Sequence, residues 1–85
     1  MKVLIPSALR SYTESSNADA TGVTLVELLA DLDRQYPGIR FRIVDEQDRI
    51  RRHIRIFING AQEHELSRAL SDKDEVVIVQ ALSGG

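Results

Sequence analysis

The sequence DKDEVVIVQALSGG, which covers residues 72–85, decides the fold of this chain. Successive side chains of a strand point to opposite faces, so Val76–Val79 would place apolar side chains on both faces. A strand that is apolar on both faces is central in a sheet or carries a binding patch. We therefore expect Glu75–Gln80 to be a strand with neighbours on both sides, followed by the tail Leu82–Gly85.

The sequence before this strand predicts a hairpin. Polar and apolar residues alternate in His53–Ile58, which would place its isoleucines on one face. Asn59 and Gly60 follow, and both residue types tolerate the positive φ angles of a tight turn. Ala61–Glu65 is therefore expected to be the return strand, and Leu66–Leu70 a helical turn.

The clearest helix signal lies in the first half of the chain. Thr24 can cap a helix, and Glu27 stands three residues later, as in a capping box. Apolar residues follow at helical spacing, and Pro37-Gly38 ends the helix. The apolar positions, which we expect to form a core face, are Leu25, Leu28, Leu29, Leu32 and Tyr36.

The N-terminal segment predicts a second hairpin. Lys2–Ile5 is a β-rich run that Pro6 closes, because proline has no N–H for a ladder. Ser11–Ala18 is rich in Ser, Thr and Asn and is expected to be a loop. Asp19–Val23 would then pair back onto the first strand, whereas Ile39–Arg52 fits neither the helical nor the strand period.

The elements thus follow in the order strand, strand, helix, strand, strand, strand. This order predicts an α+β domain, in which a mixed sheet of four to five strands packs on one main helix. The last strand has no partner nearby in the sequence, and a central slot between the first and third strands would cover both its edges. That arrangement is the β-grasp, or ubiquitin-like, fold. We expect residues 1–81 to form the domain and residues 82–85 a flexible Gly-Gly tail.

Length and composition exclude several classes of protein. The 85 residues make one small domain, and the longest apolar run is too short for a membrane-spanning helix. The chain has no cysteine, two distant histidines and no glycine-rich phosphate loop, so we expect no metal site and no self-contained enzyme. A net charge of −2 argues against a general nucleic-acid binder. The N-terminus has no signal-peptide pattern, so we expect a cytoplasmic protein.

Charge is distributed unevenly along the chain. Residues 40–55 contain six arginines against three carboxylates, a net charge of +3, so the remainder carries −5. This asymmetry suits docking to a charged partner, because complementary fields speed association. The alternative is a solvated face, the commoner role of clustered surface charges. The arginines could also bind phosphates, although few aromatic residues accompany them for base stacking.

The tail is the chemical feature of the sequence. Glycine lacks Cβ, so Gly84 and Gly85 would let the tail thread a narrow active site. The end of such a tail offers an α-carboxylate, which is unreactive toward nucleophiles until ATP converts it to an acyl-adenylate. A sulfur donor or an amine can then displace AMP, with the adenylating machinery supplied by a partner. The alternative is a frayed terminus without chemistry.

Several motifs, in their order along the chain, resemble the ThiS/MoaD sulfur-carrier family. They are Phe57-Ile58-Asn59, the turn Asp72–Val76 and the terminal Ser83-Gly84-Gly85. A narrower resemblance, to the CysO-like branch of that family, rests on Ile5–Arg10, on Tyr36–Arg40, and on Asp45-Glu46 followed by Arg51-Arg52. The resemblance spans the whole chain.

The resemblance implies a carrier rather than an enzyme. In this family the terminal glycine, here Gly85, is adenylated with ATP by a ubiquitin-activating-type enzyme and converted to a thiocarboxylate. A sulfur-accepting synthase then uses the sulfur to make cysteine or another sulfur-containing metabolite or cofactor. A metalloprotease that releases the product or trims the tail is a further implied partner. The carrier itself would bind no cofactor, and Leu82, Ser83 and Gly84 would complete its tail.

Two alternatives to a sulfur carrier stay open at this point. The chain could be a ubiquitin-like modifier, in which the activated Gly85 is joined to lysines of other proteins. It could also be a β-grasp interaction module whose tail has no chemistry.

The last strand also predicts a docking face. If Val76 and Ile78 face the helix, then Val77 and Val79 lie on the opposite face. Neighbouring strands would add to an exposed apolar patch with an arginine at its edge, and such patches usually bind a partner. The alternative is that residues 39–52 cover the patch. The residues expected to bind a partner are Phe57, Val77, Val79, Arg55 and Leu4.

Overall fold

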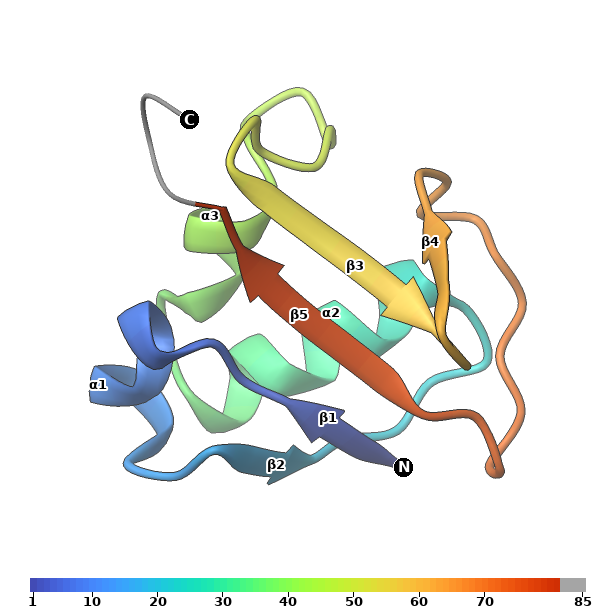
Figure 1. Ribbon diagram of the computed structural model, residues 1–85, viewed down its shortest axis with the longest axis horizontal. Helices are drawn as coiled ribbons and strands as arrows, with labels where there is room; N and C mark the ends of the chain where they lie inside the picture. The colour runs from blue at the N-terminus through green and yellow to red at the C-terminus, as the bar shows by residue number, and fades with distance from the viewer. Residues whose placement is uncertain (82–85) are drawn as a thin grey trace.

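A five-stranded mixed sheet packs against one main helix in the computed structural model, which describes residues 1–81 (Figure 1). The strand order is β2-β1-β5-β3-β4. The strands are β1 (Lys2–Leu4), β2 (Asn17–Asp19), β3 (Ile54–Ile58), β4 (Ala61–Glu63) and β5 (Val76–Gln80). The helices are the 3-10 helix η1 (Ser7–Leu9) and the α-helices α1 (Arg10–Thr13), α2 (Leu25–Gln35) and α3 (Ile39–Ile43).

Strand β5 is the centre of the sheet, as its apolar sequence predicts. It pairs in parallel with β1, where Leu4 stands beside Val77. It pairs antiparallel with β3, where Phe57 also stands beside Val77. Both edges of this strand are therefore covered, which confirms the central slot and the α+β, ubiquitin-like β-grasp fold.

Helix α2 begins at the predicted cap. The Thr24 side-chain oxygen accepts a hydrogen bond of 3.3 Å from the Glu27 N–H, which satisfies one of the donors left unpaired at a helix start. The Glu27 carboxylate accepts in return from the Val23 N–H at 3.5 Å. The apolar stripe of the helix is buried at Leu25, Leu28, Leu29 and Leu32.

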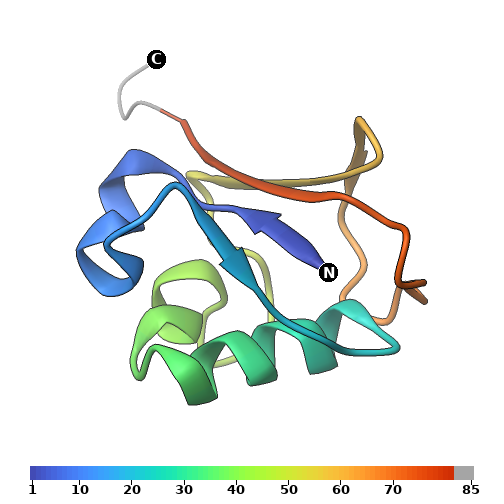
Figure 2. The ribbon, with the colours of Figure 1, turned by 90° about the horizontal axis from the view of Figure 1, so that it is seen from below.

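The core lies between the sheet and the helices. Figure 2 shows α2 and α3 on the same side of the sheet. Strands β3 and β5 send alternate side chains into this layer, namely Ile54, Ile56, Ile58, Val76 and Ile78. The helix side of the sheet is thus apolar, and the intervening side chains of both strands point the other way.

The N-terminal hairpin is present, but its predicted position was wrong. The second strand is Asn17–Asp19 rather than Asp19–Val23, and Lys2 pairs with Asp19. Residues 7–13, which overlap the expected loop, form η1 and α1. These short helices bury Leu9 and Thr13, whereas β2 buries only Ala18. A strand with one small buried residue has no alternating apolar pattern by which a sequence could reveal it.

Two further segments differ from the sequence-based expectations. Ile39–Ile43 is a helix, α3, with both of its end residues buried in the core. The return strand β4 ends at Glu63, because the Glu63 carboxylate accepts hydrogen bonds from the next two backbone N–H groups. Leu66–Leu70 is not a helical turn. Its carbonyls accept from the N–H groups of Leu25 and Val26, so this segment pairs with the start of α2.

Candidate functional site

The end of β5 positions the tail. Ile54 pairs with Gln80, and the next residue, Ala81, donates its N–H to the His53 carbonyl at 2.7 Å. The sheet therefore holds the chain up to the last described residue. Four residues follow, and an extended segment of this length spans about 13 Å. The predicted site residue Gly85 and the tail residues Leu82, Ser83 and Gly84 lie outside the described residues.

The predicted docking residues lie together on the face of the sheet opposite α2. Val77 has Leu4 on one side and Phe57 on the other, and Val79 stands beside Arg55. Val79 is 39% exposed, and the other four are half-buried. The predicted orientation of these strands is therefore confirmed, and the role of this face in binding stays a prediction.

The buried residues of segment 39–52 lie on the other side of the sheet from this face. Ile39, Ile43 and Val44 are fully buried in the core on the α2 side of the sheet. Val44 also forms a β-bridge with Ile50, which closes the following loop on itself. Val79 on this face is therefore exposed, and the other four predicted docking residues are half-buried.

Arg55 stands at the edge of this face with its side chain held in place. Its guanidinium donates to the Arg52 carbonyl at 2.7 Å and to the Ile54 carbonyl at 3.2 Å. A guanidinium has five donors, so further donors are available to a partner. The role of Arg55 at the edge of a docking patch stays a prediction.

A pocket at the base of the tail was not predicted from the sequence. It has a volume of about 480 Å³, and its lining residues come from the end of β5, from α3, from η1 and from the start of β3 with the residues just before it. The basic composition of residues 40–55 was the available signal, but nothing in the sequence places these residues beside Gln80. The pocket is lined by Leu9, Phe41, Arg42, Arg51, Arg52, His53, Ile54 and Gln80.

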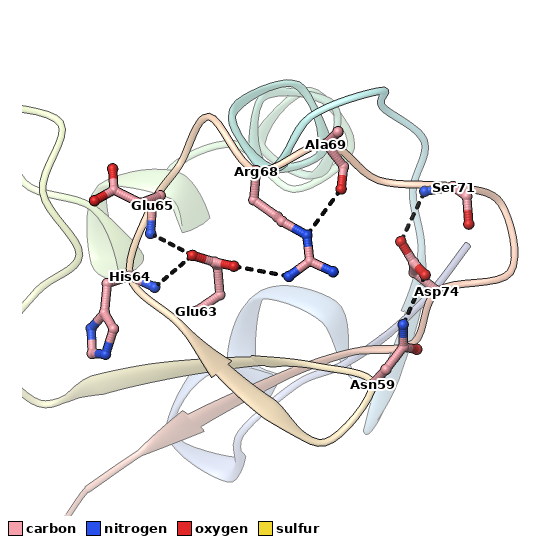
Figure 3. Close-up of polar contacts among 8 residues, drawn as sticks. All are labelled: Asn59, Glu63, His64, Glu65, Arg68, Ala69, Ser71 and Asp74. Atoms are coloured by element: carbon pink, nitrogen blue, oxygen red, sulfur yellow. Dashed lines mark hydrogen bonds and ion pairs between the residues drawn. The ribbon is translucent and has the colours of Figure 1, made fainter.

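A polar network at the opposite end of the sheet stabilises the connection between β4 and β5 (Figure 3). The Glu63 carboxylate accepts from the Arg68 guanidinium at 2.9 Å, which is the main cause that lowers the pKa of Glu63. The Asp74 carboxylate accepts from the Ser71 N–H and from the Asn59 side chain, and these bonds lower the pKa of Asp74. Each charge has partners within the fold, so this network is structural.

The described residues contain neither a group of metal-ligating side chains nor a membrane-spanning helix. Within residues 1–81, no group of three or more His, Cys, Asp or Glu side chains is placed to hold a metal ion. The same residues contain no helix with the length and apolar character needed to cross a membrane.

Comparison with known proteins identifies similar chains over nearly the full length. The sulfur carrier protein CysO of Mycobacterium tuberculosis is 33% identical over an alignment 89 residues long. The alignment covers 98% of this chain and 96% of that protein. A CysO chain in the crystal structure of the Amycolatopsis orientalis BexX/CysO complex is 30% identical, with a TM-score of 0.89 over 99% of this chain and 98% of the other.

A third similar structure is the small archaeal modifier protein 1 of Methanosarcina acetivorans. It is 27% identical, with a TM-score of 0.82, and the match covers 99% of this chain and 94% of that protein. The family model described as the ThiS family matches residues 3–85, which is almost the entire sequence. With this match and the full-length CysO relatives, the chain belongs to the ThiS family.

Proposed function

We propose that this chain is a sulfur carrier whose terminal Gly85 is activated and loaded with sulfur for biosynthesis, with cysteine as the favoured product. The observation that carries the proposal is the full-length similarity to the sulfur carrier protein CysO. Proteins of the ThiS and CysO type are small carriers rather than enzymes, in agreement with the expectation that this chain is not an enzyme.

The proposed reaction has two steps, the first at the α-phosphorus of ATP and the second at the Gly85 carbonyl carbon. The Gly85 carboxylate attacks the α-phosphate of ATP in a partner enzyme, which releases pyrophosphate and forms an acyl-adenylate. A sulfur donor then attacks the carbonyl and displaces AMP, so a carbon–sulfur bond replaces the carbon–oxygen bond to the phosphate. The chain supplies the carboxylate and a glycine tail that fits a narrow channel. A sulfur-accepting synthase and a metalloprotease complete the proposed set of partners.

The fold supports this proposal through the position of the tail. Strand β5 pairs with β3 up to Gln80, and Ala81 donates its N–H to the His53 carbonyl, so hydrogen bonds hold the backbone up to the tail base. A base held in this way restricts the directions in which the tail can leave, which lowers the entropy lost when a partner orients it. The complex named for the Amycolatopsis CysO shows that this relative assembles with another protein, as a carrier must.

The test is an intact-mass measurement on the full chain. The protein is incubated with the ubiquitin-activating-type adenylating enzyme of its own organism, ATP and sulfide. We expect a mass increase that corresponds to one oxygen exchanged for one sulfur, dependent on ATP. An unchanged mass under conditions in which the enzyme consumes ATP with another carrier would contradict the proposal.

A second candidate function is protein modification. The structural similarity to small archaeal modifier protein 1 of Methanosarcina acetivorans favours it, and the activation step would be the same. The two candidates separate after activation, because a modifier forms an amide with lysine and a carrier forms a thiocarboxylate. Lysine-linked adducts ending in Gly84-Gly85 in cell extracts would support the modifier.

A further inference from the structure

The pocket at the tail base carries positive charge without any carboxylate. Its lining includes Arg42, Arg51, Arg52 and His53, but no Asp or Glu. A larger pocket of about 850 Å³ shares Arg51, Arg52 and Ile54 with it, and its lining also includes Asp48, Glu63 and Glu65. Arg51 and Arg52 thus also border a pocket that contains carboxylates, whereas Arg42 lines only the tail-base pocket of these two.

One arginine of this pocket stacks on an aromatic ring. The Arg51 guanidinium lies over the Phe41 ring at 4.5 Å from its centroid and donates to the Phe41 carbonyl at 2.6 Å. Arg51 is thereby fixed, and Phe41 is 56% exposed. Arg42 and Arg52 are exposed, and neither side chain makes a hydrogen bond or ion pair with another residue in 1–81. We call these four residues, Phe41, Arg42, Arg51 and Arg52, the tail-base cluster.

Four other arginines have a carboxylate partner, whereas Arg10 and Arg55 donate only to backbone carbonyls. Arg40 contacts Asp48 at 3.0 Å, and Arg68 contacts Glu63 at 2.9 Å. Arg34 pairs with Asp31 on α2. Local charge compensation is thus available elsewhere on the surface, and its absence at Arg42 and Arg52 coincides with the point from which the tail leaves.

The length of the tail determines which surface a partner must touch. Four residues reach about 13 Å, so a partner that receives Gly85 in an enclosed site must lie close against the tail base. Its surface would then cover Arg42 and Arg52 and remove water from them. Removing water from a guanidinium without giving it a hydrogen-bond acceptor costs much free energy. Such a partner therefore needs carboxylates at this contact.

We propose that the tail-base cluster docks an acidic protein surface, the one that surrounds the channel through which a partner receives the tail. The proposal rests on the function proposed above, because it uses the tail as the reason for contact. It adds to that function a charge requirement on the partner: Asp and Glu side chains at the channel entrance, placed to bind Arg42 and Arg52 and to extend over Phe41.

The charge distribution of the whole chain favours this orientation. The chain carries −2 in total, so an acidic surface is repelled by most of the molecule and attracted at the basic segment. Fields of this kind orient an encounter and raise its rate, and they are screened by salt. A long RNA strand is a poorer fit, because it would extend from the cluster over the acidic remainder of the surface.

The first test measures association of the full chain with its activating enzyme at low and high salt. We expect Arg42→Glu and Arg52→Glu each to slow association by about tenfold at low salt, with the difference shrinking as salt is added. The matched control is Lys73→Glu, the same charge reversal at an exposed turn at the far end of β5. Equal rates for all three variants, or an effect independent of salt, would overturn the proposal.

A second test keeps the inference separate from the proposed function. The isotope-labelled chain is titrated with a hexaglutamate peptide, and backbone amide shifts are followed by NMR. We expect shifts around residues 41–42 and 51–53 that vanish in the Arg42→Glu/Arg52→Glu variant. Shifts elsewhere, or stronger shifts with an RNA hexamer, would overturn the docking proposal. A chain that binds the peptide in this way but is never adenylated would refute the proposed function alone.

Discussion

The proposed chemistry depends on Gly85, because the proposal places the activated carboxylate on this residue and a glycine can enter a narrow channel. Removing Gly85 is expected to abolish adenylation and leave thermal stability unchanged, since the core lies entirely within residues 3–78. The measurement pairs a thermal melt with ATP-dependent pyrophosphate release. Gly84→Ala retains the carboxylate and serves as the graded variant, which should be adenylated more slowly. Full adenylation of the truncated chain would refute the tail assignment.

Val77 is the centre of the predicted docking face, with Leu4 and Phe57 as its neighbours. Val77→Asp, or Phe57→Ala, is expected to weaken binding to the activating enzyme by about thirtyfold, because one apolar anchor can contribute about 2 kcal/mol. The change in stability should be smaller, since side chains that are not fully buried usually contribute less to folding. Enzyme binding is measured by titration and stability by urea unfolding.

The control for this face is Val26→Asp on α2. Val26 is 41% exposed, close to the value for Val79 on the docking face, and it lies on a helix on the other side of the sheet. The Val26→Asp variant should therefore bind the enzyme as the parent chain does. A large loss of stability in Val77→Asp with unaltered binding would show that the face serves folding instead.

Among the elements, α2 has a close contact at its start between the backbone at Gly22 and its own first turns. A Cβ placed on Gly22 would lie 2.8 Å from the Glu27 carbonyl carbon and also against the Leu28 nitrogen. Both are backbone atoms that cannot rotate away, so Gly22→Ala should cost about 2 kcal/mol of unfolding free energy or more. Urea unfolding measures the loss.

Gly60→Ala is the matched control for Gly22→Ala, because it adds the same Cβ at a position without close backbone contacts. Gly60 has a φ of +87° with open space around the position of a Cβ, so only backbone strain of about 1 kcal/mol is expected. A larger loss at Gly60 than at Gly22 would show that turn conformation outweighs the contact with α2.

The elements also differ in how far the sequence could predict them. Helix α2 and strand β3 have long, regular apolar patterns, and both were predicted within a residue or two of their observed bounds. Helix α3 has only five residues, so its buried ends Ile39 and Ile43 are too few to define a period. The segment Leu66–Leu70 takes its path from hydrogen bonds to the start of α2, which is distant in sequence.

At the scale of the whole molecule, acid should weaken the fold through three carboxylates. Hydrogen bonds from neighbouring backbone and side-chain donors lower the pKa of Asp45, Glu63 and Asp74 in the folded state. A carboxylate with a lowered folded pKa stabilises the fold above its unfolded pKa and loses that contribution as pH falls through the folded value. The free energy of unfolding should therefore stay level from neutral pH to about 5 and fall below about 4.

Asp74→Asn isolates one of these groups. The amide keeps one acceptor but cannot titrate, so the variant should be less stable at neutral pH and should lose less stability on acidification. Asp72→Asn, in the exposed part of the same turn, is the control and should follow the parent curve. Parallel curves for Asp74→Asn and the parent, measured by urea unfolding at several pH values, would contradict the role given to Asp74.

The sequence by itself determined the fold class, the central position of β5, the main helix and the turn at Asn59-Gly60. The physical reason is that these features depend on local periodicity and on residues with special φ preferences, which act within a few positions. It also determined which side chains of β3 and β5 share a face, because the side-chain period of a strand is fixed.

Only the tertiary structure decided the position of β2, the path of residues 64–75 and the arginine pocket at the tail base. Each of these depends on groups that are distant in the sequence. Asn17–Asp19 becomes a strand because it can pair with the edge of β1. Arg42, Arg51 and Arg52 become a docking candidate because folding brings them into one pocket with Gln80. Such contacts arise from the packing of whole elements, which no local pattern specifies.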